Sequence, residues 1–234
     1  MSAWALQVDE RATEWATARG ELESAGPAVF EAAVRAAAAA GFTTHVVDVT
    51  KQKLVTIKAA GEDEDYTMPD PRFDGVSHLS LAANFISSID SNALAVFGSL
   101  TTLDLAANSL EEIPMLSGLS LLTTLNLSCN RLGPWLAAEA EMAAERLRAL
   151  PALATLSFRQ CSLTELPTPV LSGCGSLTSL SLVCNNIAAV PVLPDSVAAT
   201  LLTFLAAYNP FASEPGAADA LTAALPRCTQ LRIA

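Results

Sequence analysis

The sequence has few basic residues, and this scarcity argues against two classes of partner. Lys and Arg together number 13 of 234 residues against 24 Asp and Glu, which gives a formal net charge of −11. Neutralising a run of phosphates requires Lys and Arg clustered on one face. The lysines (Lys51, Lys53 and Lys58) all lie within eight residues, and the arginines are scattered. We therefore expect neither nucleic-acid binding nor attachment to an anionic membrane surface.

Long apolar segments, a secretory signal and paired cysteines are also missing. No stretch reaches the roughly 18 uninterrupted apolar residues of a membrane-spanning helix. The N-terminus carries no basic region ahead of an apolar one, as a signal peptide would. The five cysteines form an odd set without paired spacing, which fits thiols kept reduced inside the cell. The sequence thus predicts a soluble, cytoplasmic protein.

One pattern, LxxLxLxxNxLxxL, recurs through most of the chain. About a third of all residues are Leu or Ala, a bias that favours a repeated structural unit. The closest copies are Val76–Ile89, Leu100–Ile113, Leu122–Trp135, Leu153–Leu166 and Leu177–Val190, with looser ones from Val47 and Leu201 and a last strand at Cys228–Ile233. The polar anchor of each repeat is Gln52, Asn84, Asn108, Asn130, Cys161, Asn185 or Asn209. Successive anchors are 32, 24, 22, 31, 24 and 24 residues apart.

Elementary geometry explains why such a repeat needs neighbours. The two leucines of LxL stand at period two, so both face one side of a short strand while the residue between them faces the other. The Asn side chain has both donors and acceptors, and it can satisfy backbone groups where the chain turns inward after the strand. A single repeat cannot bury its apolar face, but a stack of repeats can.

The pattern resembles the leucine-rich repeat family, of the intracellular type without cysteine-rich caps, from about residue 44 onward. The resemblance implies an α/β solenoid. One curved parallel sheet of about eight strands would form the concave face, with short helices and turns on the convex side. Proline after the second apolar residue (Pro114, Pro167 and Pro191) predicts extended or single-turn segments on that side.

Some segments depart from the repeat and set the predicted domain boundaries. Residues 1–41 read as two amphipathic helices that cap the repeat domain, residues 42–234. An alternative treats Trp4 and Trp15 as a stripe that binds a partner. Within the repeat domain, residues 61–74 form an acidic loop and residues 133–152 one amphipathic convex helix. Residues 212–234 are similar to the C-terminal caps of intracellular family members.

The resemblance implies a non-catalytic protein-interaction module. Small intracellular members often act as adaptors, or as structural or regulatory subunits of larger assemblies, including cytoskeletal and ciliary ones. Partners usually bind the concave face, where Arg and Tyr are the side chains most often found at binding hot spots. The candidate partner-binding residues on this face are Asp48, Asp104, Asn126, Arg159, Gln160, Leu205, Tyr208 and Arg232.

The chemistry of an enzyme is not indicated by the sequence. The alternative to a binding module is a metal- or thiol-dependent enzyme that uses His45, His78 and Asp48, or an exposed cysteine. The two histidines fall in different positions of their repeats, and no fourth ligand is evident. The acidic loop lacks the ligand spacing of an EF-hand, and no Gly-rich phosphate loop follows a strand. We expect protein partners, with no cofactor, metal or small-molecule substrate.

Overall fold

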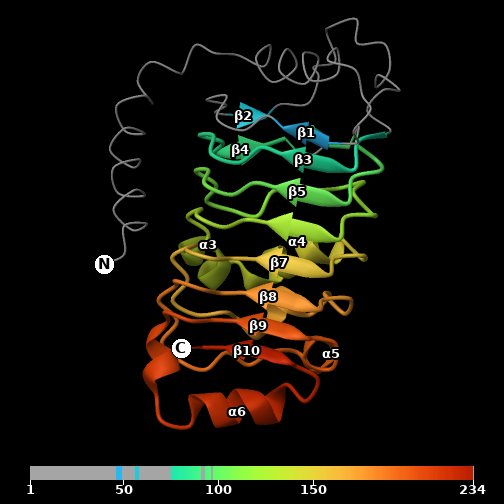
Figure 1. The fold of residues 1–234 in the computed structure, drawn as a ribbon. Coiled ribbons are helices and arrows are strands. Elements are labelled where there is room, and N and C mark those ends of the chain that lie inside the picture. The colour runs from blue at the N-terminus through green and yellow to red at the C-terminus, as the bar shows by residue number, and fades with distance from the viewer. Residues whose placement is uncertain (1–45, 49–55, 58–74, 91–92, 96, 234) are drawn as a thin grey trace, which may run out of the picture.

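The computed structural model describes residues 46–48, 56–57, 75–90, 93–95 and 97–233. The predicted helical cap at residues 1–41 and the acidic loop at residues 61–74 lie outside these ranges, as do His45 and Gln52. The described residues form a single stack of parallel coils, with the C-terminal helix α6 at one end (Figure 1). This is the solenoid that the repeat pattern predicts.

An eight-stranded parallel sheet runs the length of the stack, as predicted. Each strand is three residues long and pairs with the strand of the next repeat, so the spatial order is β1-β3-β5-β6-β7-β8-β9-β10. The strands are β1 (Val46–Asp48), β3 (His78–Ser80), β5 (Thr102–Asp104), β6 (Thr124–Asn126), β7 (Thr155–Ser157), β8 (Ser179–Ser181), β9 (Thr203–Leu205) and β10 (Gln230–Arg232).

The strands pair without slippage, so equivalent residues of the repeats form continuous rows. The first leucine of each LxL lies beside its counterpart, as in Leu103 beside Leu125 and Leu125 beside Leu156, and all three side chains are fully buried. The second leucine of each LxL, such as Leu105, is equally buried. A one-residue slip would expose every one of these side chains, which is why the apolar pattern fixes the register.

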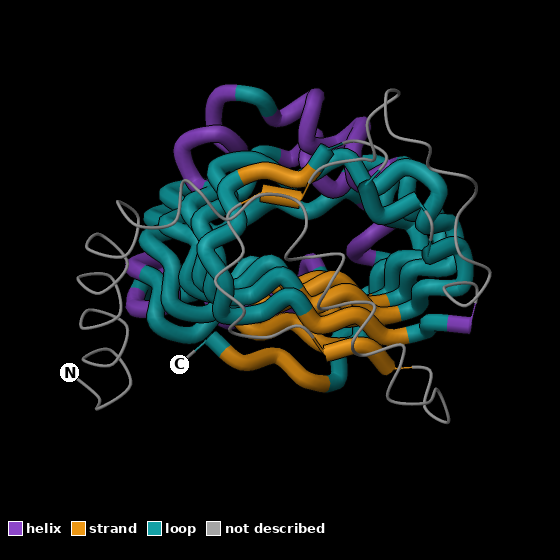
Figure 2. Tube along the Cα trace, turned by 90° about the horizontal axis from the view of Figure 1, so that it is seen from above, coloured by secondary structure: helices purple, strands orange, loops and turns teal. Residues whose placement is uncertain are grey.

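The opposite side of each coil consists mainly of turns and short helices (Figure 2). A small parallel sheet of β2 (Thr56–Ile57) and β4 (Ser88–Ile89) also lies there. After Pro114, Pro167 and Pro191 the chain forms single turns or stays extended. This was predicted, because proline lacks the backbone N–H that a longer helix needs. The helical segments are α3 (Gly133–Ala138), α4 (Ala140–Arg148), η2 (Thr168–Leu171), α5 (Asp195–Ala198), η3 (Pro210–Ser213) and α6 (Ala217–Ala224).

The prediction of one helix across residues 133–152 is wrong, because two helices occupy the segment. The chain leaves helical geometry at Glu139, whose φ is −123° and ψ is 44°, and its N–H donates to the carbonyl of Trp135. Both helices turn an apolar side inward: Leu136 is buried in α3, and Ala143 and Leu147 are buried in α4. No Pro or Gly marks the break, so the spacing of apolar residues could not reveal it.

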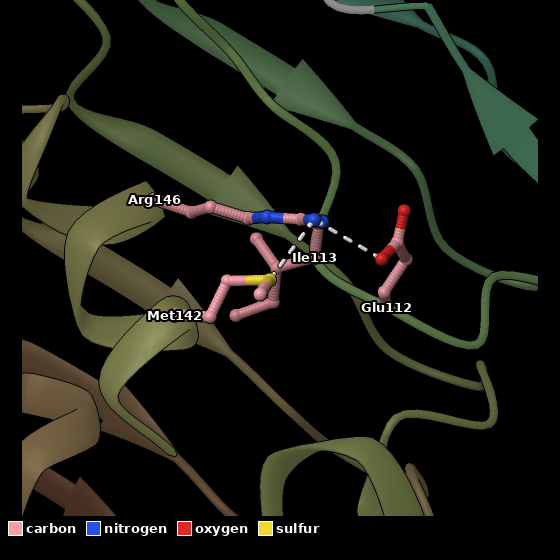
Figure 3. A network of polar contacts seen from close by, with 4 residues as sticks. All are labelled: Glu112, Ile113, Met142 and Arg146. Atoms are coloured by element: carbon pink, nitrogen blue, oxygen red, sulfur yellow. Dashed lines mark hydrogen bonds and ion pairs between the residues drawn. The ribbon is translucent and has the colours of Figure 1, made fainter. Parts of the chain in front are cut away.

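Arg146 fastens α4 to the repeat before it (Figure 3). Its guanidinium is 3.1 Å from a carboxylate oxygen of Glu112 and donates to the backbone carbonyl of Ile113. It also lies over the ring of Trp135, 4.9 Å from the centroid, and contacts the Met142 sulfur. The side chain is only 14% exposed. Cation–π contacts gain strength when they are shielded from water.

Gly133 lets the start of α3 approach the next repeat closely. Its N–H donates to the carbonyl of Cys161 at 2.9 Å. A Cβ atom at this position would lie 2.0 Å from the carbonyl oxygen of Ser162, closer than any contact between non-bonded atoms allows. Glycine is needed here because backbone meets backbone, and no flexible side chain can move aside.

We therefore expect Gly133→Ala to lower the free energy of unfolding by at least about 2 kcal/mol, because the two backbones must separate. Gly175→Ala is the matched control, since a Cβ there meets nothing within 4 Å. That change should shift stability by no more than about 0.5 kcal/mol. Denaturant titration of both variants measures the difference, and equal stabilities would contradict the close approach.

Candidate functional site

The anchor asparagines hold neighbouring repeats together through their side-chain amides. The Asn130 Nδ2 donates to the carbonyls of Leu127 in its own repeat, at 2.9 Å, and of Leu105 in the preceding one, at 3.0 Å. Its Oδ1 accepts the N–H of Leu110 at 3.0 Å. Asn108, Asn185 and Asn209 make the same two kinds of bond. Each amide thus satisfies backbone groups that would otherwise be buried without partners.

The stacked hydrogen bonds of the anchor side chains form a ladder through the repeats, and Cys161 makes only the donor bond of this ladder. Its thiol lies 3.1 Å from the Leu127 carbonyl, the place taken by Nδ2 elsewhere. Burial raises the pKa of the thiol to about 12, so the group stays protonated and can donate. A thiol has no counterpart to Oδ1. Among the hydrogen bonds of the described residues, the N–H of buried Leu132 has no acceptor, whereas the equivalent N–H of Leu110 bonds to Asn130.

In the described repeats, the residue before the anchor adopts left-handed backbone geometry. Its φ lies between 53° and 59° at Ala83, Ala107, Cys129, Gln160, Cys184 and Tyr208. Sheet hydrogen bonding continues to this point, since the Cys184 N–H donates to the carbonyl of Ala207 at 2.9 Å. A left-handed residue other than Gly costs about 1–2 kcal/mol. The repeats tolerate this cost because the hydrogen bonds of the anchor hold the next residue in place. The left-handed position lies at the rim of the face that the strands line.

The strand-lined face is the surface formed by the outward-pointing residues of the eight strands. Its central column follows directly from the register and consists of Asp48, Ser80, Asp104, Asn126, Ser157, Ser181, Leu205 and Arg232. The candidate residues from this column therefore lie on one surface. Asp48 is placed by its backbone pairing with Ser80 alone.

Two of the candidate residues also serve the fold. An Asp104 carboxylate oxygen accepts the N–H of Ala106 at 2.9 Å, and the Asn126 Oδ1 accepts both the N–H and the hydroxyl of Ser128. The Ser128 hydroxyl also lies 2.8 Å from that of Ser157. These bonds hold the chain as it leaves the strand. The middle of the face is therefore polar, but its polar side chains are largely hydrogen-bonded to one another and to nearby backbone.

A row of threonine hydroxyls also joins neighbouring repeats, although no structural role was predicted for these residues. Thr101 donates through its hydroxyl to the carbonyl of Ser77 at 2.9 Å, and Thr123 donates likewise to Thr101 at 3.0 Å. Thr178 repeats the bond to Ala154 at 3.1 Å. The signal was present as Thr or Ser at one position of successive repeats.

The C-terminal part of the face differs in character from the rest. Leu202 is 41% and Tyr208 77% exposed, and Leu205 is half-buried between them in the same repeat. Arg159 and Arg232 are exposed on either side of that repeat, and Gln160 is half-buried next to Arg159. We call Arg159, Leu202, Leu205, Tyr208 and Arg232 the C-terminal patch. Leu202 was not among the predicted binding residues, although its column holds polar or small residues in the other repeats.

The alternative of a catalytic or metal centre depends on His, Cys, Asp and Glu side chains. Within the described residues no group of three His, Cys, Asp or Glu side chains is close enough together to hold a metal ion. One ring nitrogen of His78 lies 2.8 Å from the Ser77 hydroxyl, and His45 lies outside the described ranges. Burial raises the pKa of the Cys174 thiol to about 11, as it does for Cys161. Low thiol pKa values accompany reactive cysteines, so these two are structural.

Over the described part of the chain, no helix combines the length and the apolar character that crossing a bilayer requires.

The parallel solenoid and its ladder of anchor amides identify this chain as a repeat protein. Comparison with known proteins agrees with this class. The family model described as "Leucine rich repeat" matches residues 74–132. Residues 74–132 therefore match the leucine-rich repeat family, and the chain has the solenoid fold of that family. A search of curated proteins by sequence found no match.

The fold is similar to that of a solved structure. The crystal structure of human 5T4 (Wnt-activated inhibitory factor 1, trophoblast glycoprotein) has a TM-score of 0.55 and 20% identity, over 71% of this chain and 60% of that one. A chain of the Drosophila Toll–Spatzle complex has a TM-score of 0.47 and 20% identity, over 56% of this chain and 17% of that one. The chain thus spans less than two thirds of the length of either neighbour.

The ladder predicts that Cys161→Asn stabilises the protein, by about 1 kcal/mol, because the new Oδ1 can accept the N–H of Leu132. Cys174→Asn is the control: this thiol is also buried but lies off the ladder, so an amide there lacks prepared partners and should destabilise. Chemical denaturation measures both. A loss of stability in Cys161→Asn as large as in the control would show that the ladder position has no special chemistry.

Proposed function

We propose that this chain is a non-catalytic protein-interaction module that binds its partner on the strand-lined face. Leucine-rich repeats form extended solenoid surfaces of the kind used for recognition. In this proposal the chain acts as an adaptor, or as a structural or regulatory subunit, in a larger cytoplasmic assembly of cytoskeletal or ciliary type. The family match and the fold support an interaction module, and the assembly is inferred by analogy with small family members.

The exposed Tyr208 carries the proposal. The other anchors of the described repeats are preceded by Ala, Cys or Gln, and among these repeats only Tyr208 places an aromatic ring at this rim position. A ring that is 77% exposed leaves apolar surface in contact with water, and Leu202, 41% exposed, adds to it at the other end of β9. Tyr is among the residues most enriched at hot spots, because its ring can be buried while the hydroxyl keeps a polar contact.

The surroundings of Tyr208 suit a binding surface. A hot spot needs a few large anchors among smaller, nearly neutral contacts that exclude water. The neighbouring strand provides these with Ser179 and Ser181, followed by Val183 and Cys184, all half-buried. Short side chains at these positions let a bulky element of a partner approach the sheet.

The cysteines support the cytoplasmic part of the proposal. Cys161 and Cys174 are buried as small apolar residues, and Cys129, Cys184 and Cys228 are half-buried free thiols. Free thiols in these numbers are more common in reducing compartments.

Tyr208→Ala should weaken binding to the native partner by at least about 2 kcal/mol, the loss typical of a hot-spot residue. Val192→Ala is the control, since Val192 is 70% exposed but follows Pro191 on the side away from the sheet. The partner would be isolated from the native cell with tagged wild-type protein, and both variants titrated against it. If Tyr208→Ala binds as tightly as wild type while Val192→Ala does not, the binding face has been misassigned.

A further inference from the structure

Exposed apolar side chains also occur on the side of the molecule away from the strands. Met142 of α4 and Met115 of the preceding repeat are both exposed. Arg146 connects the two regions, since its guanidinium lies 3.5 Å from the Met142 sulfur and donates to the carbonyl of Ile113, two residues before Met115 (Figure 3). Each of the two elements that meet here therefore carries an exposed methionine.

Exposed carboxylates accompany these methionines. They are Glu111 of the preceding repeat, Glu139 just before α4, and Glu141 and Glu145 on α4 itself. In the described part of the chain, none of these side chains makes an ion pair or a hydrogen bond. The arginines of α4 do not neutralise them, because Arg146 pairs with Glu112 and Arg148 leaves the helix beside Gly173, on the side of the next repeat. The outer side of α4 is therefore acidic as well as apolar.

The outer side of α4 presents its carboxylates and its methionine in neighbouring rows. Glu141 and Glu145 are four residues apart, as are Met142 and Arg146, so each pair lies along one row of the helix. A second helix packed alongside α4 repeats its own side chains with the same period. Such a helix can place Lys or Arg beside the carboxylates and a large apolar residue against Met142. Methionine is flexible and polarisable, so it adapts to the shape of that residue.

We propose that the outer side of α4, together with Met115, binds a basic amphipathic helix of a second partner protein. Its Lys or Arg side chains pair with the free carboxylates, and a large apolar side chain contacts Met115 and Met142. Insertions in repeat proteins often belong to a binding face, and this one leaves the pairing of β6 with β7 unchanged (Figure 2). The inference goes beyond the proposed function, because a partner on the strand-lined face leaves α4 free for another protein.

The test uses synthetic, Ala-rich helical peptides and the full-length protein. The Lys–Leu peptide carries a row of Lys beside a row of Leu, the Glu–Leu peptide has Glu in place of Lys, and the Lys–Ala peptide has Ala in place of Leu. Fluorescence anisotropy at about 0.15 M salt, where exposed charges are largely screened beyond about 8 Å, measures their affinities. Wild type should bind the Lys–Leu peptide at least about tenfold more tightly than either of the others.

Matched charge variants locate the site. Glu141→Lys combined with Glu145→Lys should weaken binding of the Lys–Leu peptide at least about tenfold. Asp195→Lys combined with Asp219→Lys is the control, since it changes the net charge equally on exposed positions of α5 and α6. The control should alter the affinity by no more than about twofold. Circular dichroism confirms that both variants, altered only at exposed positions, remain folded.

Three results would overturn the inference. Equal losses in the two charge variants would show that only net charge attracts the peptide, and equal affinity for the Lys–Leu and Lys–Ala peptides would show that the methionines contribute nothing. No binding of the Lys–Leu peptide up to about 1 mM would exclude the site itself.

The variant Tyr208→Ala separates this inference from the proposed function. It alters the strand-lined face alone, so it should bind the Lys–Leu peptide as tightly as wild type. If Tyr208→Ala loses the peptide, the peptide occupies the strand-lined face, and the assignment to α4 is wrong while the proposed function stands.

Discussion

The hydrogen bonds of the buried anchor side chains are the constraint on which the rest of the structure depends. Each repeat must turn its backbone inward after the strand, and buried backbone groups without hydrogen-bond partners would destabilise the fold. An amide such as that of Asn130 solves this for two repeats at once, because it donates to carbonyls of both and accepts an N–H from the earlier one. The ladder thereby holds the repeats in one register. That register places the side chains between the core leucines in columns, and the columns form the strand-lined face.

The helical insertion shows how the solenoid accepts an irregular repeat. Helices α3 and α4 lie on the side away from the strands, and the pairing of β6 with β7 is the same as elsewhere. Arg146 ties the insertion backward to Glu112 and Ile113, and Gly133 allows it to meet the next repeat at Ser162. The same step of the ladder carries Cys161 in place of Asn. The ladder position that lacks an acceptor thus belongs to the longest described repeat. The attachments of the insertion help to hold these two neighbouring repeats together.

The sequence predicted what depends on periodicity and could not predict what depends on particular contacts. Leucines at period two, with Asn three residues after the second leucine, are enough to place eight strands and to align Ser157 with Ser181 and Leu205. The break at Glu139 went unseen, since no Pro or Gly marks it and apolar spacing continues across it. The packing of the Arg146 side chain against the preceding repeat could not be predicted either, because a charged residue on a helix is normally solvated. On the candidate site, the patch residues could be aligned from sequence, but exposure and internal hydrogen bonding had to come from the structure.

The central claim is that the ladder creates one continuous face whose C-terminal end binds the partner. Amide hydrogen exchange, followed by mass spectrometry on the chain alone and in complex with the partner co-purified from the native cell, tests this most directly. The account predicts slower exchange on binding in the segments that contain β9 and β10, with helices α3 and α4 unaffected. Protection confined to α3 and α4, with unchanged exchange across β9 and β10, would contradict it.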